Sequence, residues 1–391
     1  MQSTAIVHVL KRALAQQEAE SPAMESLLGA LAQVPDPRRR QGRRYPLPFL
    51  LGALVLALLC NCNSLEAVGQ WCAEHRDLLA AHFPAQRFHT PTGSLLRRLL
   101  PRLSVVHLEA ALAAWVQGSA QAEEHEALAW DGKAGRGAAS AGGAAPHLLS
   151  VSTHRTHEPL VQVRVDEKTN DIPVARALLP VVPVAGRVVT ADALHTCAQT
   201  AQALLDHDAA YLLVVKANQP TLDAECAAYF SDPSARVGRY TQVDRRRGRT
   251  ETRTLYATTQ LNAHLGRYSA FPHLGQVACL LHTVTDRRGT RREVRFLLTS
   301  LTPQLADPER LLTLARGHWS IESRPWIRDV TFGEDRSPLR SGDAPQILAA
   351  LRNLAHTLIR RSGTTAIAAA RRSFSYHPAR ALALLLSPSR G

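Results

Sequence analysis

Residues 127–133 read ALAWDGK, and residues 188–192 read VVTAD. Each stretch is a short apolar run that ends on a carboxylate, Asp131 in the first and Asp192 in the second. Short runs of this composition are typical of β-strands. In open sheets built from strands and helices, ligands bind near the carboxyl ends of the strands. The two aspartates are therefore the first indication of a functional site.

The segments around these two runs predict a mixed sheet. The order is β-β-β-α-β-α-β, with the first three strands as a meander. The remaining strands are predicted at residues 147–153, 160–165 and 211–216, and the helices at 172–182 and 195–205.

The flanking sequence has a different character on each side. Residues 1–122 show apolar positions at the three- and four-residue spacing of helices. Residues 219–303 look like a β-rich insertion, with strands at 240–243, 250–257, 277–284 and 294–299. A helix over 308–328 and a helical tail, broken near Ser362-Gly363 and at Pro378, complete the chain. We therefore expect three domains, at 1–122, 123–343 and 344–391.

The composition favours a globular protein with a polyanionic partner. The 391 residues are 45% hydrophobic and 20% charged, and 46 Lys and Arg against 33 Asp and Glu give a net charge of +13. A protein this basic usually binds nucleic acid. The six cysteines are scattered without a Cys-x-x-Cys pair, so we expect free thiols in a reducing cytoplasm and no zinc ribbon or disulfide framework.

One apolar stretch resembles a membrane span. Residues 47–60 read LPFLLGALVLALLC, but about 14 apolar residues fall short of the roughly 20 that a spanning helix needs. We expect a buried helix and no membrane partner.

A third carboxylate completes a possible metal site. Glu322 lies within the helix-like run 311–327. If it meets Asp131 and Asp192 at one end of the sheet, the three could bind two Mg²⁺ ions, which prefer carboxylate oxygens with other positions left to water and phosphate. Two such ions assist phosphodiester displacement. Each residue alone is explained as well by a turn or a solvated helix face.

Basic side chains near these segments are candidates for phosphate contact, which gives affinity and salt dependence without sequence choice. The candidates are Arg38, Arg39, Arg40, Arg43, Arg44, Lys133, Lys216, Arg245, Arg246, Arg247 and Arg249.

Several blocks resemble the DDE transposases of the ISAs group of bacterial insertion sequences, also called H-repeat-associated proteins. The blocks include AWDGK at 129–133, VDEKTNDIP at 165–173, TADALHT at 190–196 and GHWSIE at 317–322. The resemblance covers residues 28 to 360 in the same order.

The resemblance implies an RNase H-like core with a β insertion, preceded by a helical domain and followed by a helical tail. It also implies that Asp131, Asp192 and Glu322 bind Mg²⁺, with Mn²⁺ as a substitute. The expected reaction cuts the ends of an insertion sequence and joins them to target DNA. The expected partner is double-stranded DNA, bound by a homodimer or higher oligomer in the bacterial cytoplasm, associated with the nucleoid.

The sequence departs from the family after Glu322. The family usually has Glu-Asn-x-Leu-His-Trp, whereas residues 322–326 read ESRPW, one residue shorter and with a proline. The Tyr-Arg-Glu-Lys spacing of related transposases is also absent. Two alternatives therefore stay open: a catalytically inactive DNA-binding relic, and an RNase H-like nuclease without strand transfer. An aspartyl phosphatase is disfavoured, because no second Asp lies two positions after Asp131.

Overall fold

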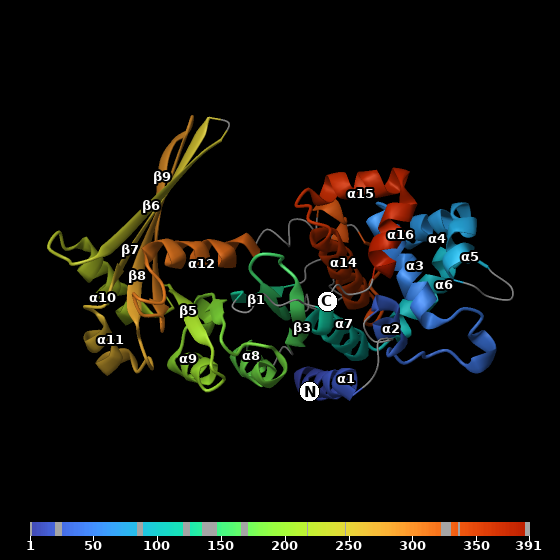
Figure 1. The fold of residues 1–391 in the computed structure, drawn as a ribbon, viewed down its shortest axis with the longest axis horizontal. Helices are drawn as coiled ribbons and strands as arrows, with labels where there is room; N and C mark the ends of the chain where they lie inside the picture. Colours follow the sequence, from blue (N-terminus) through green and yellow to red (C-terminus); the bar gives the residue numbers. More distant parts are fainter. Residues whose placement is uncertain are drawn as a thin grey trace. The chain divides into compact units, whose positions relative to one another are not determined.

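The computed structural model describes residues 2–19, 26–83, 89–119, 126–134, 147–165, 171–216, 218–246, 248–321, 330–334 and 337–387. Helices come first along the chain, strands and helices alternate in the middle, and helices end it (Figure 1). This order is the one that the sequence predicts.

The N-terminal segment is helical. Its helices are α1 (Gln2–Ala19), α2 (Leu27–Ala32), α3 (Leu47–Leu59), α4 (Leu65–Glu74), α5 (Arg76–His82), α6 (Gly93–Leu99) and α7 (Val105–Ser119). Side-chain oxygens of Ser26, Ser64 and Thr92 accept backbone N–H groups at the starts of α2, α4 and α6, as N-cap residues do.

Helix α3 is the apolar stretch of the sequence analysis, and it is buried almost throughout. That burial confirms the predicted core helix. In the described part of the chain, no single helix has the length and apolarity to cross a membrane, although the bent pair Gly93–Arg102 and Val105–Gly118 does by length and composition together.

The strands form one sheet in the order β3-β2-β1-β4-β5-β9-β8-β7-β6. The first five are β1 (Leu128–Ala134), β2 (His147–Thr153), β3 (Pro159–Val165), β4 (Val188–Ala191) and β5 (Ala210–Val215). Strand β4 is parallel to β1 and β5, whereas β2 and β3 are antiparallel to each other. This mixed sheet is the expected RNase H-like core.

Helices α8 (Asp171–Leu178) and α9 (Ala198–Leu205) lie on either side of β4 in the sequence. The predicted helix over 172–182 changes to a 3-10 turn at Leu179–Val181. Pro180 explains the change, because it has no N–H to donate within an α-helix.

The insertion continues the sheet of the core. It contains β6 (Gly238–Arg246), β7 (Arg249–Thr258), β8 (Gln276–Asp286) and β9 (Gly289–Thr299), all antiparallel, with β9 paired to β5. The strands are longer than predicted. Two helices that the sequence analysis missed, α10 (Pro220–Ser231) and α11 (Asn262–Ser269), lie within the insertion.

Helix α12 (Pro308–Ile321) packs against β4, β6 and β7. Its Leu311 and Leu312 share a buried core with Leu255 of β7, Leu280 of β8 and Leu297 of β9. Helix α12 therefore covers one face of this part of the sheet.

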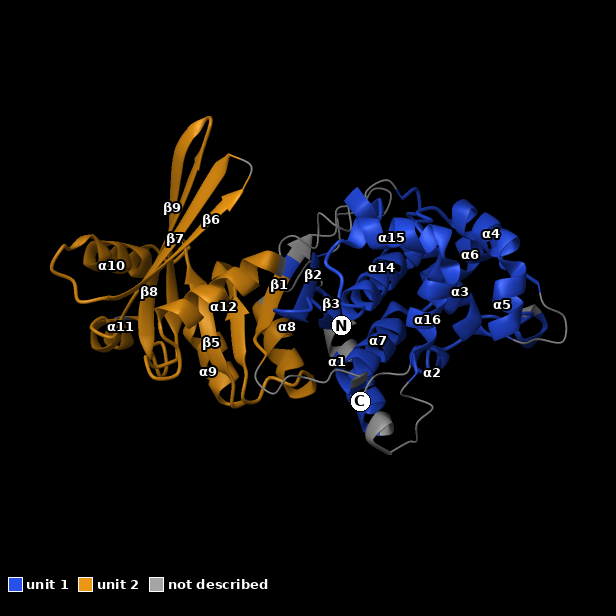
Figure 2. Cartoon of the chain, turned by 45° about the horizontal axis from the view of Figure 1, so that its top comes forward, with its two compact units in different colours: residues 1–122, 132–170, 322–391 blue, residues 123–131, 171–321 orange. Residues whose placement is uncertain are grey.

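The chain ends in α14 (Ala344–Arg361), α15 (Ile367–Tyr376) and α16 (Pro378–Leu386), with the predicted breaks at Gly363 and Pro378. By internal contacts the chain forms two compact units (Figure 2). Unit 1 comprises residues 1–122, 132–170 and 322–391, and unit 2 comprises residues 123–131 and 171–321.

Candidate active site

The register of β1 and β4 places Asp131 beside Asp192. These strands are parallel neighbours, and Trp130 is the partner of Ala191. The next residue along each chain segment is an aspartate: Asp131 within β1, and Asp192 directly after β4. Because neighbouring strands lie about 4.8 Å apart, the two half-buried carboxylates leave the same edge of the sheet side by side.

Both aspartates lie on the face of the sheet that α12 covers. Ala129 is the partner of Thr190, so these two residues share a face. Side chains two positions apart lie on the same face of a strand, which adds Asp131 and Asp192 to that face. Thr190 bonds to His318 of α12. The end of α12 and the two carboxylates are therefore on one side of the sheet.

The bond between Thr190 and His318 fixes a neutral imidazole next to this edge. The Thr190 hydroxyl donates to the carbonyl of Leu128 at 3.2 Å, so it accepts from Nδ1–H of His318 at 3.1 Å. Burial lowers the pKa of His318 to about 4, although Asp192 acts in the opposite direction. His318 is thus uncharged at neutral pH, and it ties α12 to β4 two residues before Asp192.

The loop that carries Asp192 is held by the end of β5. Asp192 accepts the backbone N–H of Leu194 at 3.1 Å through Oδ1. Asn218, which follows β5, donates to the carbonyl of Ala193 at 2.8 Å. The sequence analysis did not assign this function to Asn218, since a polar residue after a strand is equally typical of an ordinary turn.

Several predicted site residues lie outside the described part of the chain. Glu322 and Arg247 are among them, and the side chain of Lys133 is not described. Glu322 directly follows the last described residue of α12. Lys216, at the end of β5, is exposed. Among the described residues, no group of three His, Cys, Asp or Glu side chains could hold a metal ion.

The N-terminal arginine cluster divides into bonded and exposed members. The guanidinium of Arg38 is 6% exposed and binds Asp36 at 2.8 Å, and it also donates to the carbonyl of Tyr45. Its positive charge lowers the pKa of Asp36, chiefly through their hydrogen bond. Arg43 donates to the carbonyl of Arg38 at 2.9 Å. These contacts give Arg38 and Arg43 a structural role in the loop. Arg43 is nevertheless exposed, as are Arg39, Arg40 and Arg44.

The arginines of the insertion lie where β6 and β7 meet. Arg245, Arg246 and Arg249 are exposed, and Arg246 is the partner of Arg249 in the ladder. Arg249 forms an ion pair with Glu251 at 2.6 Å.

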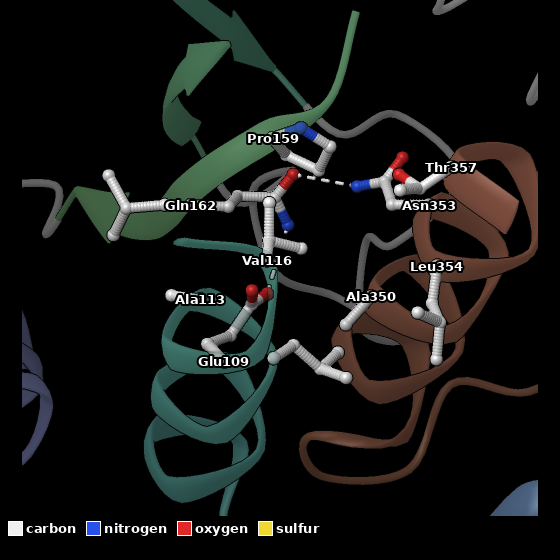
Figure 3. A pocket seen from close by; sticks show the side chains of 11 residues that line it. Glu109, Ala113, Val116, Pro159, Gln162, Ala350, Asn353, Leu354 and Thr357 are labelled. Atoms are coloured by element: carbon white, nitrogen blue, oxygen red, sulfur yellow. Dashed lines mark hydrogen bonds between the residues drawn. The ribbon is translucent and has the colours of Figure 1, made fainter. Parts of the chain in front are cut away.

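Unit 1 contains a buried polar chain at the edge of a small cavity (Figure 3). Gln162 of β3 donates to Glu109 of α7, and Asn353 of α14 donates to Gln162, each at 3.0 Å. The three side chains satisfy one another across three elements. This arrangement explains how polar groups are tolerated in a core, and we assign it to packing.

Two family matches cover most of the chain. Residues 119–358 match the family described as "Transposase DDE domain", and residues 28–116 match the domain described as "DDE_Tnp_1-associated". "Putative transposase YncI" of Escherichia coli O157:H7 is 23% identical over 347 residues, covering 86% of this chain and 88% of that protein. "H repeat-associated putative transposase YhhI" of Escherichia coli K12 is 22% identical over 350 residues, covering 86% and 90%.

A solved structure is also similar. It is titled "Cryo-EM structure of piggyBac transposase synaptic complex with hairpin DNA (SNHP)" and has a TM-score of 0.45 at 13% identity. The similarity covers 97% of this chain and 81% of that one.

Proposed function

We propose that this chain, which belongs to the transposase DDE domain family, cuts the ends of an insertion sequence and joins them to target DNA. The observation that carries the proposal is the pairing of β1 with β4, which sets Asp131 beside Asp192. We assign metal ligation to these two residues and to Glu322.

The chemistry of these residues fits a divalent cation. Two carboxylates side by side repel each other unless a cation lies between them. Asp192 uses Oδ1 to accept the N–H of Leu194, and its Oδ2 has no hydrogen bond to the residues that the structure describes. Mg²⁺, or Mn²⁺ in its place, is suited to such oxygen ligands. When bound, two cations would activate the attacking oxygen and stabilise the leaving oxygen.

The position of α12 supports the inclusion of Glu322. His318 lies four residues before Glu322 in the sequence, and it bonds to Thr190, two residues before Asp192. The described end of α12 therefore lies on the face of the sheet that carries Asp131 and Asp192. Because His318 is neutral, it does not offset the negative charge of the carboxylates.

We propose that exposed basic residues bind the phosphates of double-stranded DNA, consistent with the net charge of +13. The candidates are Arg39, Arg40, Arg44, Lys133, Lys216, Arg245, Arg246 and Arg247. Arg249 is set aside, because it is already paired with Glu251. We further propose a homodimer or higher oligomer on DNA, in the bacterial cytoplasm.

The test is cleavage and joining of the element's own end DNA, with and without Mg²⁺, by the natural protein and by Asp192→Asn. We expect cleavage to fall by more than about a hundredfold in the variant, because a lost ligand removes several kcal/mol of charge stabilisation. Asp206→Asn, at the exposed end of α9, is the matched control and should cleave normally. Equal cleavage by Asp192→Asn and Asp206→Asn would contradict the proposed site.

One observation favours an alternative. The segment after Glu322 is one residue shorter than the family usually has, and it contains Pro325. DNA binding without Mg²⁺-dependent cleavage by the natural protein would identify an inactive relic. Cleavage without joined products would identify a nuclease.

A further inference from the structure

Strands β6 to β9 extend past α10 and α12 as a four-stranded ribbon (Figure 1). Directly opposed residues of antiparallel strands share a face, and faces alternate along each strand. The registers therefore sort the side chains of the ribbon into two faces. The ion-pair face carries Gln242, Asp244, Arg246, Arg249, Glu251, Arg253, His282, Asp286, Arg291 and Glu293. The threonine face carries Thr241, Val243, Arg245, Thr250, Thr252, Thr283, Thr285, Thr290 and Arg292.

On the ion-pair face, most arginines have a carboxylate partner. Arg246, at the tip of β6, is exposed and has no ion pair with a described residue. Arg253 binds Asp244 at 2.7 Å and also pairs with Glu251. Arg249 binds Glu251 at 2.6 Å, and Arg291 binds Asp286 at 2.8 Å.

Helix α12 lies on the same side as these ion pairs. Its Arg316 reaches Asp244 at 3.6 Å, and its Trp319 stacks under Arg295 at 4.1 Å. Arg295 belongs to the ion-pair side, because it is the partner of Leu280 and Leu280 packs in the core with α12. Apart from Arg246 at the tip, the arginines of the ion-pair face are therefore engaged by the acids of this face or by α12.

At the residues that define it, the threonine face has neither acidic side chains nor a covering helix. Val243 and Val294, both on this side, are 49% and 52% exposed, so no element of unit 2 covers this part of the ribbon. Arg245 and Arg292 are exposed and have no ion pair with any described residue. Along residues 241–245 of β6 and 290–294 of β9, this face carries hydroxyl groups, two exposed valines and one unneutralised cation on each of the two strands.

We propose that the threonine face binds the sugar-phosphate backbone of duplex DNA. Hydroxyl and guanidinium groups are the usual donors to phosphate oxygens. Arg292 lies three strands from Arg245 and two residues along the ladder from the position opposite it. Strand spacings of about 4.8 Å and a rise of about 3.4 Å per residue put the two about 16 Å apart, a distance from which long side chains can reach both sides of the roughly 12 Å wide major groove. The two arginines can thus contact phosphates on both sides of one groove. The inference rests on the proposed function, and it adds Arg292 and the threonines to the predicted contacts.

The test compares two double variants of the full chain with the same loss of charge. Arg245→Gln with Arg292→Gln removes the free cations of the threonine face. Arg249→Gln with Arg291→Gln removes neutralised arginines from the ion-pair face. Their side chains are 50% and 68% exposed, so exposure alone does not separate the two pairs.

Binding to duplex DNA is measured by fluorescence anisotropy over about 50 to 200 mM salt, with a chelator present so that cleavage plays no part. We expect the threonine-face variant to bind about tenfold more weakly and its salt slope to fall by about two, since each phosphate contact contributes about 0.9. The ion-pair-face variant should bind within about threefold of the natural protein. Equal losses in both variants, or none in either, would overturn the proposal.

A third variant tests the hydroxyl groups. Thr283→Val with Thr285→Val keeps the branched shape, and we expect weaker binding at every salt concentration with an unchanged slope. Unchanged affinity would overturn the role of the threonines. Melting curves of all three variants verify that the ribbon stays folded. Failure of Mg²⁺-dependent cleavage with intact binding would count against the proposed function alone.

Discussion

His318 shows how one buried side chain couples the fold to pH. Its pKa falls from 6.5 to about 4 because burial disfavours the charged imidazole. Above pH 6.5 the imidazole is neutral in both the folded and the unfolded chain, and the fold keeps its full stability. As the pH falls from 6.5 towards 4, His318 binds a proton in the unfolded chain but not in the folded chain. Unfolding then becomes easier by up to about 3 kcal/mol.

We therefore predict that His318→Asn weakens the dependence of stability on pH in this window. The Asn amide can keep the donor to Thr190 but cannot take up a proton. The measurement is the thermal midpoint of the natural protein and the variant across the window. Parallel curves for the two proteins would show that other groups account for the pH dependence.

At the same scale, the sequence could indicate Asp131 and Asp192 because each ends an apolar run. It could not indicate the bond between Thr190 and His318, which joins residues 128 positions apart. A buried threonine in a strand and a histidine in a helix are common, and only the packing of α12 on β4 brings this pair together. Arg38 was predicted to contact phosphate because the sequence does not show whether Asp36 pairs with it or is solvated. In the structure the two side chains form an ion pair.

At the scale of elements, α4 and α6 cross with glycine against glycine. A Cβ on Gly69 would lie 2.5 Å from the backbone nitrogen of Gly93, and a Cβ on Gly93 would lie 2.7 Å from the carbonyl of Leu65. Backbone atoms cannot move aside as a flexible side chain can. The close crossing of these two helices therefore requires both glycines.

We predict that Gly69→Ala separates α4 from α6 and lowers the free energy of unfolding by about 1–3 kcal/mol. Gly266→Ala is the matched control, because Gly266 lies inside α11 and a Cβ there meets nothing within 4 Å. That control should gain up to about 1 kcal/mol from helix propensity. Chemical denaturation gives both values, and a neutral Gly69→Ala would refute the close crossing.

Element prediction succeeded where apolar runs were long or bounded by clear breaks. Strands β2 and β4 and the breaks at Gly363 and Pro378 were predicted closely. Helices α10 and α11 were missed because the neighbouring strand signals dominated the segment. Pro220 in the first turn of α10 and Asp223 three residues later were available signals for a helix start.

At the scale of the whole molecule, the contacts cut across the order of the chain. Helix α14 packs on α3 and α7, and Arg371 of α15 donates to the carbonyl of Leu58, 313 residues away. Buried Arg371 also bonds to Asn63 at 2.7 Å and stacks on Phe332 at 4.1 Å. Composition and periodicity reveal that the tail is helical but not where it packs, since many apolar helix faces in this chain are similar.

The net charge of +13 leaves two explanations for DNA binding, a diffuse attraction of the whole surface or a local one. A diffuse attraction depends on total charge, so replacing any two exposed arginines should weaken binding equally. A local attraction depends on where unneutralised cations lie. Because an ion-paired arginine already has its counter-charge, it releases few counterions when the protein binds DNA. Its removal should therefore change the affinity little.

We predict a local attraction, visible in stability as well as in affinity. Duplex DNA that binds only the folded chain raises its thermal midpoint, and the rise should vanish as salt weakens binding. Arg245→Gln with Arg292→Gln lowers the formal charge of +13 by only two, yet it should remove most of the rise at low salt. Arg97→Gln with Arg98→Gln on α6 carries the same change of charge in another part of the chain and should retain the rise. If both pairs lose it to the same extent, DNA binding follows the total charge and the ribbon has no special part in it.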